Sequence, residues 1–198
     1  MIIKSYKIFL ESLDTINSPL LSLSDNVDKH LISIIQDNVG EGSKILEVSC
    51  GNAADSLYLK ELGYDVTCTE FDEGCVNNAI DKGLNCIKHD SRLKFPFKDS
   101  EFDLTYSRLG LHYFTENELE SIIGELRRIS KKILITVKVE QDSIMTNKII
   151  LTPDKWKEII ENFFQIEIFN IKEGFLYGKE SKWIEILAKW KLKDTYNL

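Results

Sequence analysis

Residues 44–53 read KILEVSCGNA, a strand pattern that runs into a turn of small residues. The first five residues, KILEV, have the composition of a buried strand. After the turn, the apolar side chains of residues 53–62 recur at helical spacing until Gly63. A buried strand that leads directly into a helix opens a βαβ unit, so this stretch predicts a parallel sheet flanked by helices.

Strand and helix patterns alternate along the rest of the chain. Further strands are predicted over residues 65–69, 84–89, 101–107 and 132–139, and helices over 73–81, 117–129 and 153–163. Two β-rich runs, 165–172 and 182–191, lie about ten residues apart, too close for a helical crossover, and should pair antiparallel. We therefore predict an α/β fold with a doubly wound, mostly parallel, Rossmann-like sheet of seven strands and an antiparallel terminal strand.

The N-terminal part of the chain is expected to be an addition to this sheet. Residues 1–40 should form an N-terminal helical extension or lid, and residues 41–198 the main domain. One helix of the extension should begin near Ser24 or Asp25 and end before Gly40. No repeat or linker-like stretch divides the remainder, which favours one domain.

The composition is that of a soluble globular protein, with 43% hydrophobic and 29% charged residues. Lys and Arg number 25 against 32 Asp and Glu, and the net charge of −7 disfavours nucleic acid as a partner. Charged residues interrupt the apolar N-terminus, so neither a signal peptide nor a membrane span is predicted. The four cysteines form no CxxC pair; we expect structural thiols, no metal site and a cytoplasmic location.

The ligand of an open α/β sheet lies beyond the carboxyl ends of its strands, so function should be encoded there. The first turn, residues 47–54, lets a ligand approach the backbone, but it is not GxGxxG and is equally compatible with a plain turn. Glu70 ends the second strand 19 positions after Gly51, where a carboxylate can accept hydrogen bonds from both ribose hydroxyls. Asp90 ends the third strand, where it could accept from an adenine amino group or be a solvated loop residue. We therefore expect a nucleoside-containing ligand.

Four segments resemble, in order, the motifs of the class I S-adenosylmethionine-dependent methyltransferases. They are ILEVSCGNA (45–53), GYDVTCTEFD (63–72), HDS (89–91) and FPFKDSEFDLTYSRLGLHY (95–113), and the resemblance extends from residue 44 to about residue 191. SLYLKELGYDV and SRLGLHYF are most similar to small-molecule methyltransferases of the thiopurine and tellurite-resistance type. The resemblance implies S-adenosylmethionine as cofactor and S-adenosylhomocysteine as product. It also implies cofactor contacts from Glu47, Ser49, Cys50, Gly51, Asn52, Glu70, Phe71, Asp90, Ser91 and Ser107.

The first motif departs from the family pattern at two positions. The family usually has three glycines there, whereas this chain has Ser49 and Ala53 in place of the first and third and retains only Gly51. Serine and alanine are the smallest substitutes, so we expect a site that tolerates them. Weakened binding and a degenerate, non-catalytic protein are the alternatives.

Methyl transfer from a sulfonium requires mainly alignment and a water-poor pocket. An oxygen nucleophile also needs a general base, whereas a thiol or amine acceptor can react without one. His112 is either that base, because the unperturbed pKa of histidine suits neutral pH, or a packed loop residue beside Tyr113. Arg108 could hold the cofactor carboxylate or an acidic substrate, or pair with surface acids. Tyr113 and, in the N-terminal extension, Tyr6 are further candidate substrate contacts.

The predicted function is in-line methyl transfer from S-adenosylmethionine to a small-molecule acceptor. A nicotinamide-dependent oxidoreductase of the same fold is one alternative, disfavoured by the missing GxGxxG, the acidic Glu47 and the terminal hairpin. A non-catalytic cofactor-binding or partner protein is another, disfavoured by the presence of both Glu70 and Asp90. No motif reveals which atom of the acceptor is methylated.

Overall fold

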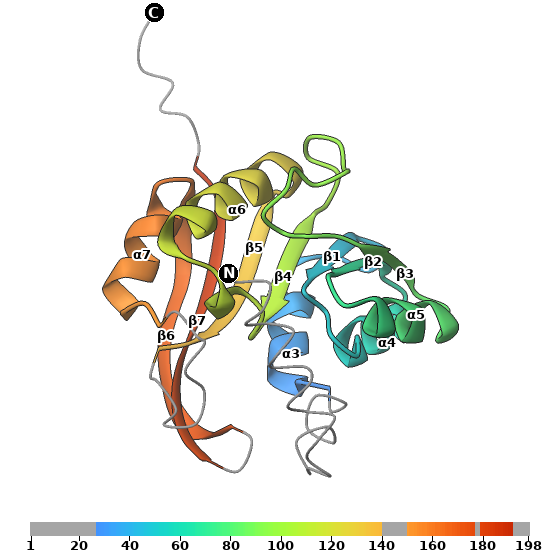
Figure 1. The fold of residues 1–198 in the computed structure, drawn as a ribbon, viewed down its shortest axis with the longest axis horizontal. Coiled ribbons are helices and arrows are strands. Elements are labelled where there is room, and N and C mark those ends of the chain that lie inside the picture. Colours follow the sequence, from blue (N-terminus) through green and yellow to red (C-terminus); the bar gives the residue numbers. More distant parts are fainter. Residues whose placement is uncertain (1–26, 140–149, 177–178, 192–198) are drawn as a thin grey trace, which may run out of the picture.

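A computed structural model describes residues 27–139, 150–176 and 179–191 of the chain. Within these ranges seven strands form one sheet in the order β3-β2-β1-β4-β5-β7-β6 (Figure 1). Strands β1 to β5 pair in parallel, and β7 pairs antiparallel with both β5 and β6. The predicted sheet with one reversed strand is confirmed. The strands are β1 (Lys44–Val48), β2 (Asp65–Glu70), β3 (Asn85–Lys88), β4 (Leu104–Arg108), β5 (Lys132–Lys138), β6 (Phe164–Leu176) and β7 (Lys179–Trp190).

Helices cover both faces of the sheet, and alternate residues of β5 show which helices lie on which face. Ile133 and Ile135 pack with α6 and α7, whereas Leu134, between them, packs with α3 and α4. On the α3 face, α5 packs on β2 and β3 beside α4. The helices of the described residues are α3 (Lys29–Asn38), α4 (Ala54–Glu61), α5 (Glu73–Asp81), α6 (Glu116–Ile129) and α7 (Pro153–Glu161), and a 3-10 helix, η1 (Leu111–Tyr113), follows β4.

Helix α3 begins later than the sequence pattern predicted. Its N-cap is Asp28, whose side chain accepts from the backbone N–H groups of His30 and Leu31. Ser24 and Asp25, where the helix was expected to begin, lie outside the described residues. The helix ends before Gly40, as predicted, and buries Leu31 and other apolar side chains in the same core as β1 and β4.

The largest errors in the predicted strand ends are in β4 and in the two terminal strands, β6 and β7. β4 begins at Leu104 rather than Glu101, because Asp103 leaves the strand path and its carboxylate accepts from the backbone N–H of Lys44 at 3.0 Å. The terminal strands extend much closer to each other than predicted, and Gly174 is a paired strand residue instead of part of a loop. The absence of a side chain on Gly174 leaves room for the Trp183 ring, which would lie 3.2 Å from a Cβ there.

No helix among the described residues has the length and apolar character needed to cross a membrane.

Candidate functional site

The first βα turn contains three residues in the left-handed backbone region, and two of them are not glycine. Ser49, Gly51 and Ala53 have φ values of 58°, 53° and 56°. This region favours glycine, because a side chain there costs roughly 1–2 kcal/mol. Ser49 and Ala53 therefore adopt the backbone conformation that glycine would adopt, and their side chains make that conformation strained. A Cβ added to Gly51 would meet nothing within 4 Å, so the turn opens onto free space at this residue.

Glu70 joins this turn to the end of β2. Its carboxylate accepts from the backbone N–H groups of Gly51 at 2.9 Å, Phe71 at 2.7 Å and Asp72 at 3.0 Å. The residue is only 1% exposed. A carboxylate has about four acceptor positions, so the backbone uses most of them. The sequence placed Glu70 beside a ligand but did not reveal that its side chain also holds two loops together.

Asp90, at the end of β3, is paired with Arg92. Oδ1 of Asp90 accepts from the backbone N–H of Arg92 at 3.0 Å and from its guanidinium Nε at 2.8 Å. Hydrogen bonds from this guanidinium, more than any other contact, lower the pKa of Asp90. The predicted adenine acceptor is therefore held by a cation that the sequence analysis did not single out. The neighbouring Ser91 is buried.

A buried polar group lies behind the first turn. Glu47 accepts a hydrogen bond of 2.5 Å from the Ser56 hydroxyl, which also lies 3.3 Å from the hydroxyl of Tyr106. Burial, reinforced by repulsion from Asp55, raises the pKa of Glu47 from 4.5 to about 8. At neutral pH this carboxyl is therefore largely protonated unless a positive charge comes close to it.

Arg108, a predicted substrate or cofactor contact, forms an ion pair with an acid of the protein interior. Its Nε lies 2.8 Å from Oδ2 of Asp55, a fully buried residue in the first turn of α4. The other oxygen of Asp55 accepts from the backbone N–H of Asp28 at 2.8 Å. Asp55 thus links β4, α4 and α3. An acid in the first turn of a helix is an ordinary feature, so no sequence signal points to this role.

Beyond β4 the chain closes over the first turn. Gly110 packs so tightly that a Cβ there would lie 2.6 Å from Cβ of Ser49 and 2.9 Å from Oγ of Ser107. Oγ of Ser107 is buried and has no hydrogen-bond partner among the described residues. The end of β4 thus places an unused polar atom next to the turn.

His112 and Tyr113 lie in η1, directly after this contact. His112 is 1% exposed, and its ring centroid is 4.5 Å from that of Tyr113. Such enclosure is typical of a packed residue, and the role of His112 as a base stays a prediction. Tyr6, the third predicted substrate contact, lies outside the described residues.

The predicted cofactor residues therefore meet along one edge of the sheet. They come from the carboxyl ends of β1, β2, β3 and β4, four strands that are adjacent in the order β3-β2-β1-β4. The bond from Gly51 to Glu70 joins the first two ends, and the backbone N–H of His89 donates to the carbonyl of Glu70 at 2.8 Å to join the third. Close packing of Gly110 on Ser49 joins the fourth.

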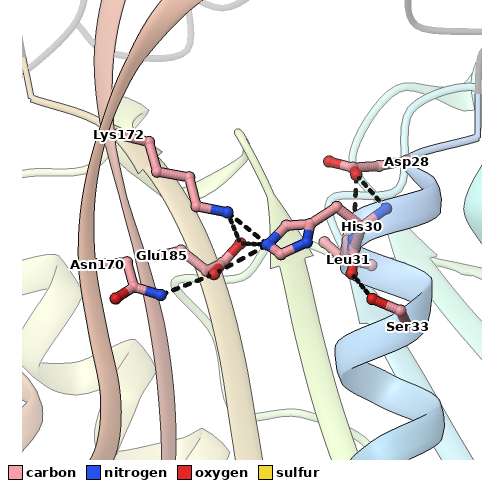
Figure 2. Close-up of polar contacts among 7 residues, drawn as sticks. All are labelled: Asp28, His30, Leu31, Ser33, Asn170, Lys172 and Glu185. Carbon is pink, nitrogen blue, oxygen red and sulfur yellow. Dashed lines mark hydrogen bonds and ion pairs between the residues drawn. The ribbon is translucent and has the colours of Figure 1, made fainter.

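A second polar cluster, missed by the sequence analysis, ties α3 to the terminal hairpin (Figure 2). At its centre is Glu185 of β7, 4% exposed, which accepts from Lys172 at 3.1 Å and from Asn170 at 3.4 Å. Nε2 of His30 lies 3.0 Å from the same carboxylate and also contacts Nζ of Lys172. Glu185 pairs with Thr136 of β5, which in turn pairs with Arg108. The cluster therefore lies at the same position along the strand direction as Arg108.

Comparison with known proteins identifies the central part of the chain. Residues 45–132 match the family described as a methyltransferase domain. An uncharacterized methyltransferase from Synechocystis sp. is 28% identical over 94 residues, which are 47% of this chain and 44% of that protein. The match therefore spans less than half the length of this curated relative.

Solved structures of the tellurite-resistance type share the fold. TehB from Haemophilus influenzae superposes with a TM-score of 0.70 at 20% identity, over 83% of this chain and 63% of that one. A TehB-like SAM-dependent methyltransferase from Corynebacterium glutamicum gives 0.68 at 18% identity, over 96% and 99%. The predicted resemblance to the S-adenosylmethionine-dependent methyltransferases, with TehB-like proteins among the structural relatives, is confirmed, and residues 45–132 carry the family match.

Proposed function

We propose that this chain binds S-adenosylmethionine at the carboxyl ends of β1 to β4 and transfers its methyl group in line to a small-molecule acceptor. The observation that carries the proposal is the contact between Gly51 and Glu70. It places a turn that opens onto free space beside a buried carboxylate, in a domain of the methyltransferase family.

The donor and acceptor groups at this edge fit the cofactor. Oγ of Ser107 is a buried polar atom without a partner among the described residues, and the space in front of Gly51 is open. Burial raises the pKa of Glu47, and a cationic group of a ligand beside the turn would favour its ionised form. These features support a ligand that combines hydroxyls, an ammonium group and a positively charged sulfur.

Each predicted residue has a task in this proposal. When bound, S-adenosylmethionine supplies an electrophilic methyl group on a sulfonium. Glu70 accepts from the ribose hydroxyls, and the peptide groups of residues 49–53 hold the amino-acid end, assisted by Glu47. Asp90 and the backbone of Ser91 face the adenine, and Phe71, 37% exposed, offers its ring as an apolar surface.

The protein's own contribution to the reaction is alignment and exclusion of water. The enclosed segment from Arg108 to Tyr113 lies where the acceptor must approach, and it carries the proposed base His112. A net charge of −7 supports a small molecule over a nucleic acid as acceptor. Four free thiols support a reducing, cytoplasmic location.

Isothermal titration calorimetry of the full chain tests the cofactor assignment. S-adenosylmethionine and S-adenosylhomocysteine should both bind with one site per chain, and a nicotinamide dinucleotide should not. Binding of the dinucleotide alone would favour the oxidoreductase alternative. Methyl transfer is tested by incubating the protein with a cell extract and methyl-labelled cofactor and searching the products by mass spectrometry. If S-adenosylhomocysteine binds but no component of the extract becomes labelled, a non-catalytic protein is favoured.

A further inference from the structure

Three of the four cysteines lie close together at the first βα turn, called the cofactor turn below, although they are far apart in the sequence. Cys50 lies in the turn after β1, and Cys68 of β2 is paired in register with Cys86 of β3. Their three sulfur atoms all lie within 4.8 Å of one another, and Sγ of Cys50 is 3.9 Å from Sγ of Cys86. Irregular spacing along the chain hid this arrangement, because the topology of three adjacent parallel strands brings the residues together (Figure 1).

The triangle of sulfurs has the dimensions of a metal-binding site. A point equidistant from three corners that are at most 4.8 Å apart lies within about 2.8 Å of each corner, and metal–thiolate bonds are about 2.3 Å long. Only a slight inward rotation of the side chains is therefore needed to place all three sulfurs around one ion. Register pairing of Cys68 with Cys86 fixes two corners on rigid strands.

The surroundings of the three thiols select the kind of ion. All three donors are sulfur, and they belong to a buried apolar cluster with Val76, Ala79 and Leu84. Soft thiolate ligands favour soft ions, and a set of three suits copper(I), whereas structural zinc usually takes four ligands. Cys68 is fully buried, and Cys50 and Cys86 are only 9% and 8% exposed, so the three thiols are shielded from bulk water.

We propose that Cys50, Cys68 and Cys86 form a three-sulfur site for one soft metal ion, copper(I) being the ion that fits the donor set. Each thiol that becomes a ligand releases its proton to solvent, and the ion stays copper(I), so no electron is transferred. Because protons compete with the ion, affinity should rise with pH.

An ion at this site would stiffen the cofactor turn. Cys50 stands between Ser49 and Gly51, and its backbone N–H already donates to the carbonyl of Thr69 at 3.1 Å. Bonding its sulfur to β2 and β3 through the ion adds a second anchor to the same residue. Binding at about a hundredfold excess over Kd should raise the midpoint of thermal unfolding by about 5–10 °C.

The test is an anaerobic titration of the reduced, metal-free full chain with copper(I) in competition with a colorimetric copper(I) chelator. One ion should bind per chain, and Cys68→Ala and Cys86→Ala should each lower the affinity at least about 100-fold. Cys75, half-buried and outside the triangle, provides the matched control: Cys75→Ala should bind copper(I) as the parent does and show the same thermal shift. Copper(I) that stays with the chelator, or equal binding by parent and triangle variants, overturns the proposal.

A second measurement needs no variant. X-ray absorption of the loaded parent protein should show three sulfur neighbours at about 2.3 Å. Two sulfur neighbours, or nitrogen and oxygen neighbours, would mean that the triangle does not hold the ion. Failure of either experiment leaves the proposed methyl transfer untouched, because calorimetry with S-adenosylhomocysteine is carried out on the metal-free chain.

Discussion

Ser49, in the first βα turn, packs against Gly110, and variants at both positions test the effect of this contact on stability. A methyl group added at Gly110 would lie 2.6 Å from Cβ of Ser49, so Gly110→Ala should lower the free energy of unfolding by about 1–3 kcal/mol. Ser49→Gly relieves the strain of φ 58° but adds chain entropy, and it should change stability by less than about 1 kcal/mol.

The double variant shows whether the contact itself is responsible. Removing the Ser49 side chain makes room for the new methyl group, so the double variant should be more stable than the sum of the two changes predicts, by about 1 kcal/mol. Urea unfolding of all four proteins measures this coupling. If the two changes in unfolding free energy simply add, the loss in Gly110→Ala comes from another contact, for instance with Oγ of Ser107.

Glu70 is expected to serve both stability and binding. Its carboxylate accepts three backbone hydrogen bonds, and hydrogen bonds to charged groups contribute about 1.5–3 kcal/mol each. Glu70→Ala should therefore lower the unfolding free energy by about 2–4 kcal/mol and weaken S-adenosylhomocysteine binding about 10- to 100-fold. Calorimetry below the melting range separates the two effects. Glu73→Gln, which removes the same charge from an exposed neighbour, should leave both unchanged.

His112 distinguishes two routes of catalysis once the acceptor is known. If the acceptor is an oxygen nucleophile and His112 is its base, His112→Gln should lower kcat by about 10²- to 10⁴-fold while cofactor binding persists. The parent rate should then rise with pH as the base loses its proton, and the variant should lose that rise. Matching pH profiles and similar turnover would show that His112 only packs against Tyr113.

At the scale of elements, the link between α3 and the terminal hairpin depends on one buried carboxylate. Glu185 accepts from Lys172 and Asn170 and contacts His30 of α3 (Figure 2). Glu185→Gln keeps the shape but removes the charge, and we expect a loss of about 1–3 kcal/mol in unfolding free energy. Glu173→Gln, which breaks an exposed pair with Lys182, is the matched control and should leave the unfolding free energy nearly unchanged. Equal losses in denaturant titrations would contradict a special role for Glu185.

Local sequence signals predicted some elements closely and others poorly, for physical reasons. Helix α5 was predicted at its observed bounds, because Asp72 caps it and Gly83 follows it directly. The ends of β6 and β7 were not, because Gly174 is a loop signal by itself. Gly174 is nevertheless paired with Ser181 of the neighbouring strand, a partner that no local pattern reveals.

The same division applies to the candidate site. The position of Glu70 and Asp90 at one edge of the sheet could be predicted, because residues at the carboxyl ends of parallel strands lie at the same edge. Asp55 as the partner of Arg108 could not, because it lies on another element and reads as an ordinary helix-start acid. Burial decides such pairs, and burial depends on the packing of α3, α4 and β4 against one another.

For the molecule as a whole, Glu47 makes stability depend on pH. Its folded-state pKa, about 8, lies above the ordinary 4.5, so between these values the folded chain holds a proton that the unfolded chain has released. This contribution is complete below about pH 4.5 and is lost as pH rises through about 8. Glu47→Gln should therefore be more stable than the parent near pH 8, by roughly 1–3 kcal/mol, and the gap should shrink toward pH 5. Urea titrations across this range check the trend, and a gap independent of pH would refute it.

The long β6–β7 hairpin also bears on the order in which the chain folds. Its partners run from Leu176 and Lys179 at the closed end to Phe164 and Trp190 at the open end, so the pairing within the hairpin is local in sequence. Local pairing closes small loops and is fast, whereas β1 can join β4 only after a long intervening segment has been brought into place. We expect the hairpin to form early and to offer β7 as a template for β5. The edge formed by the carboxyl ends of β1 to β4 is complete only when β1 lies between β2 and β4, so we expect this edge to form last. A newly made chain should then be able to bind its ligand only at the final stage of folding.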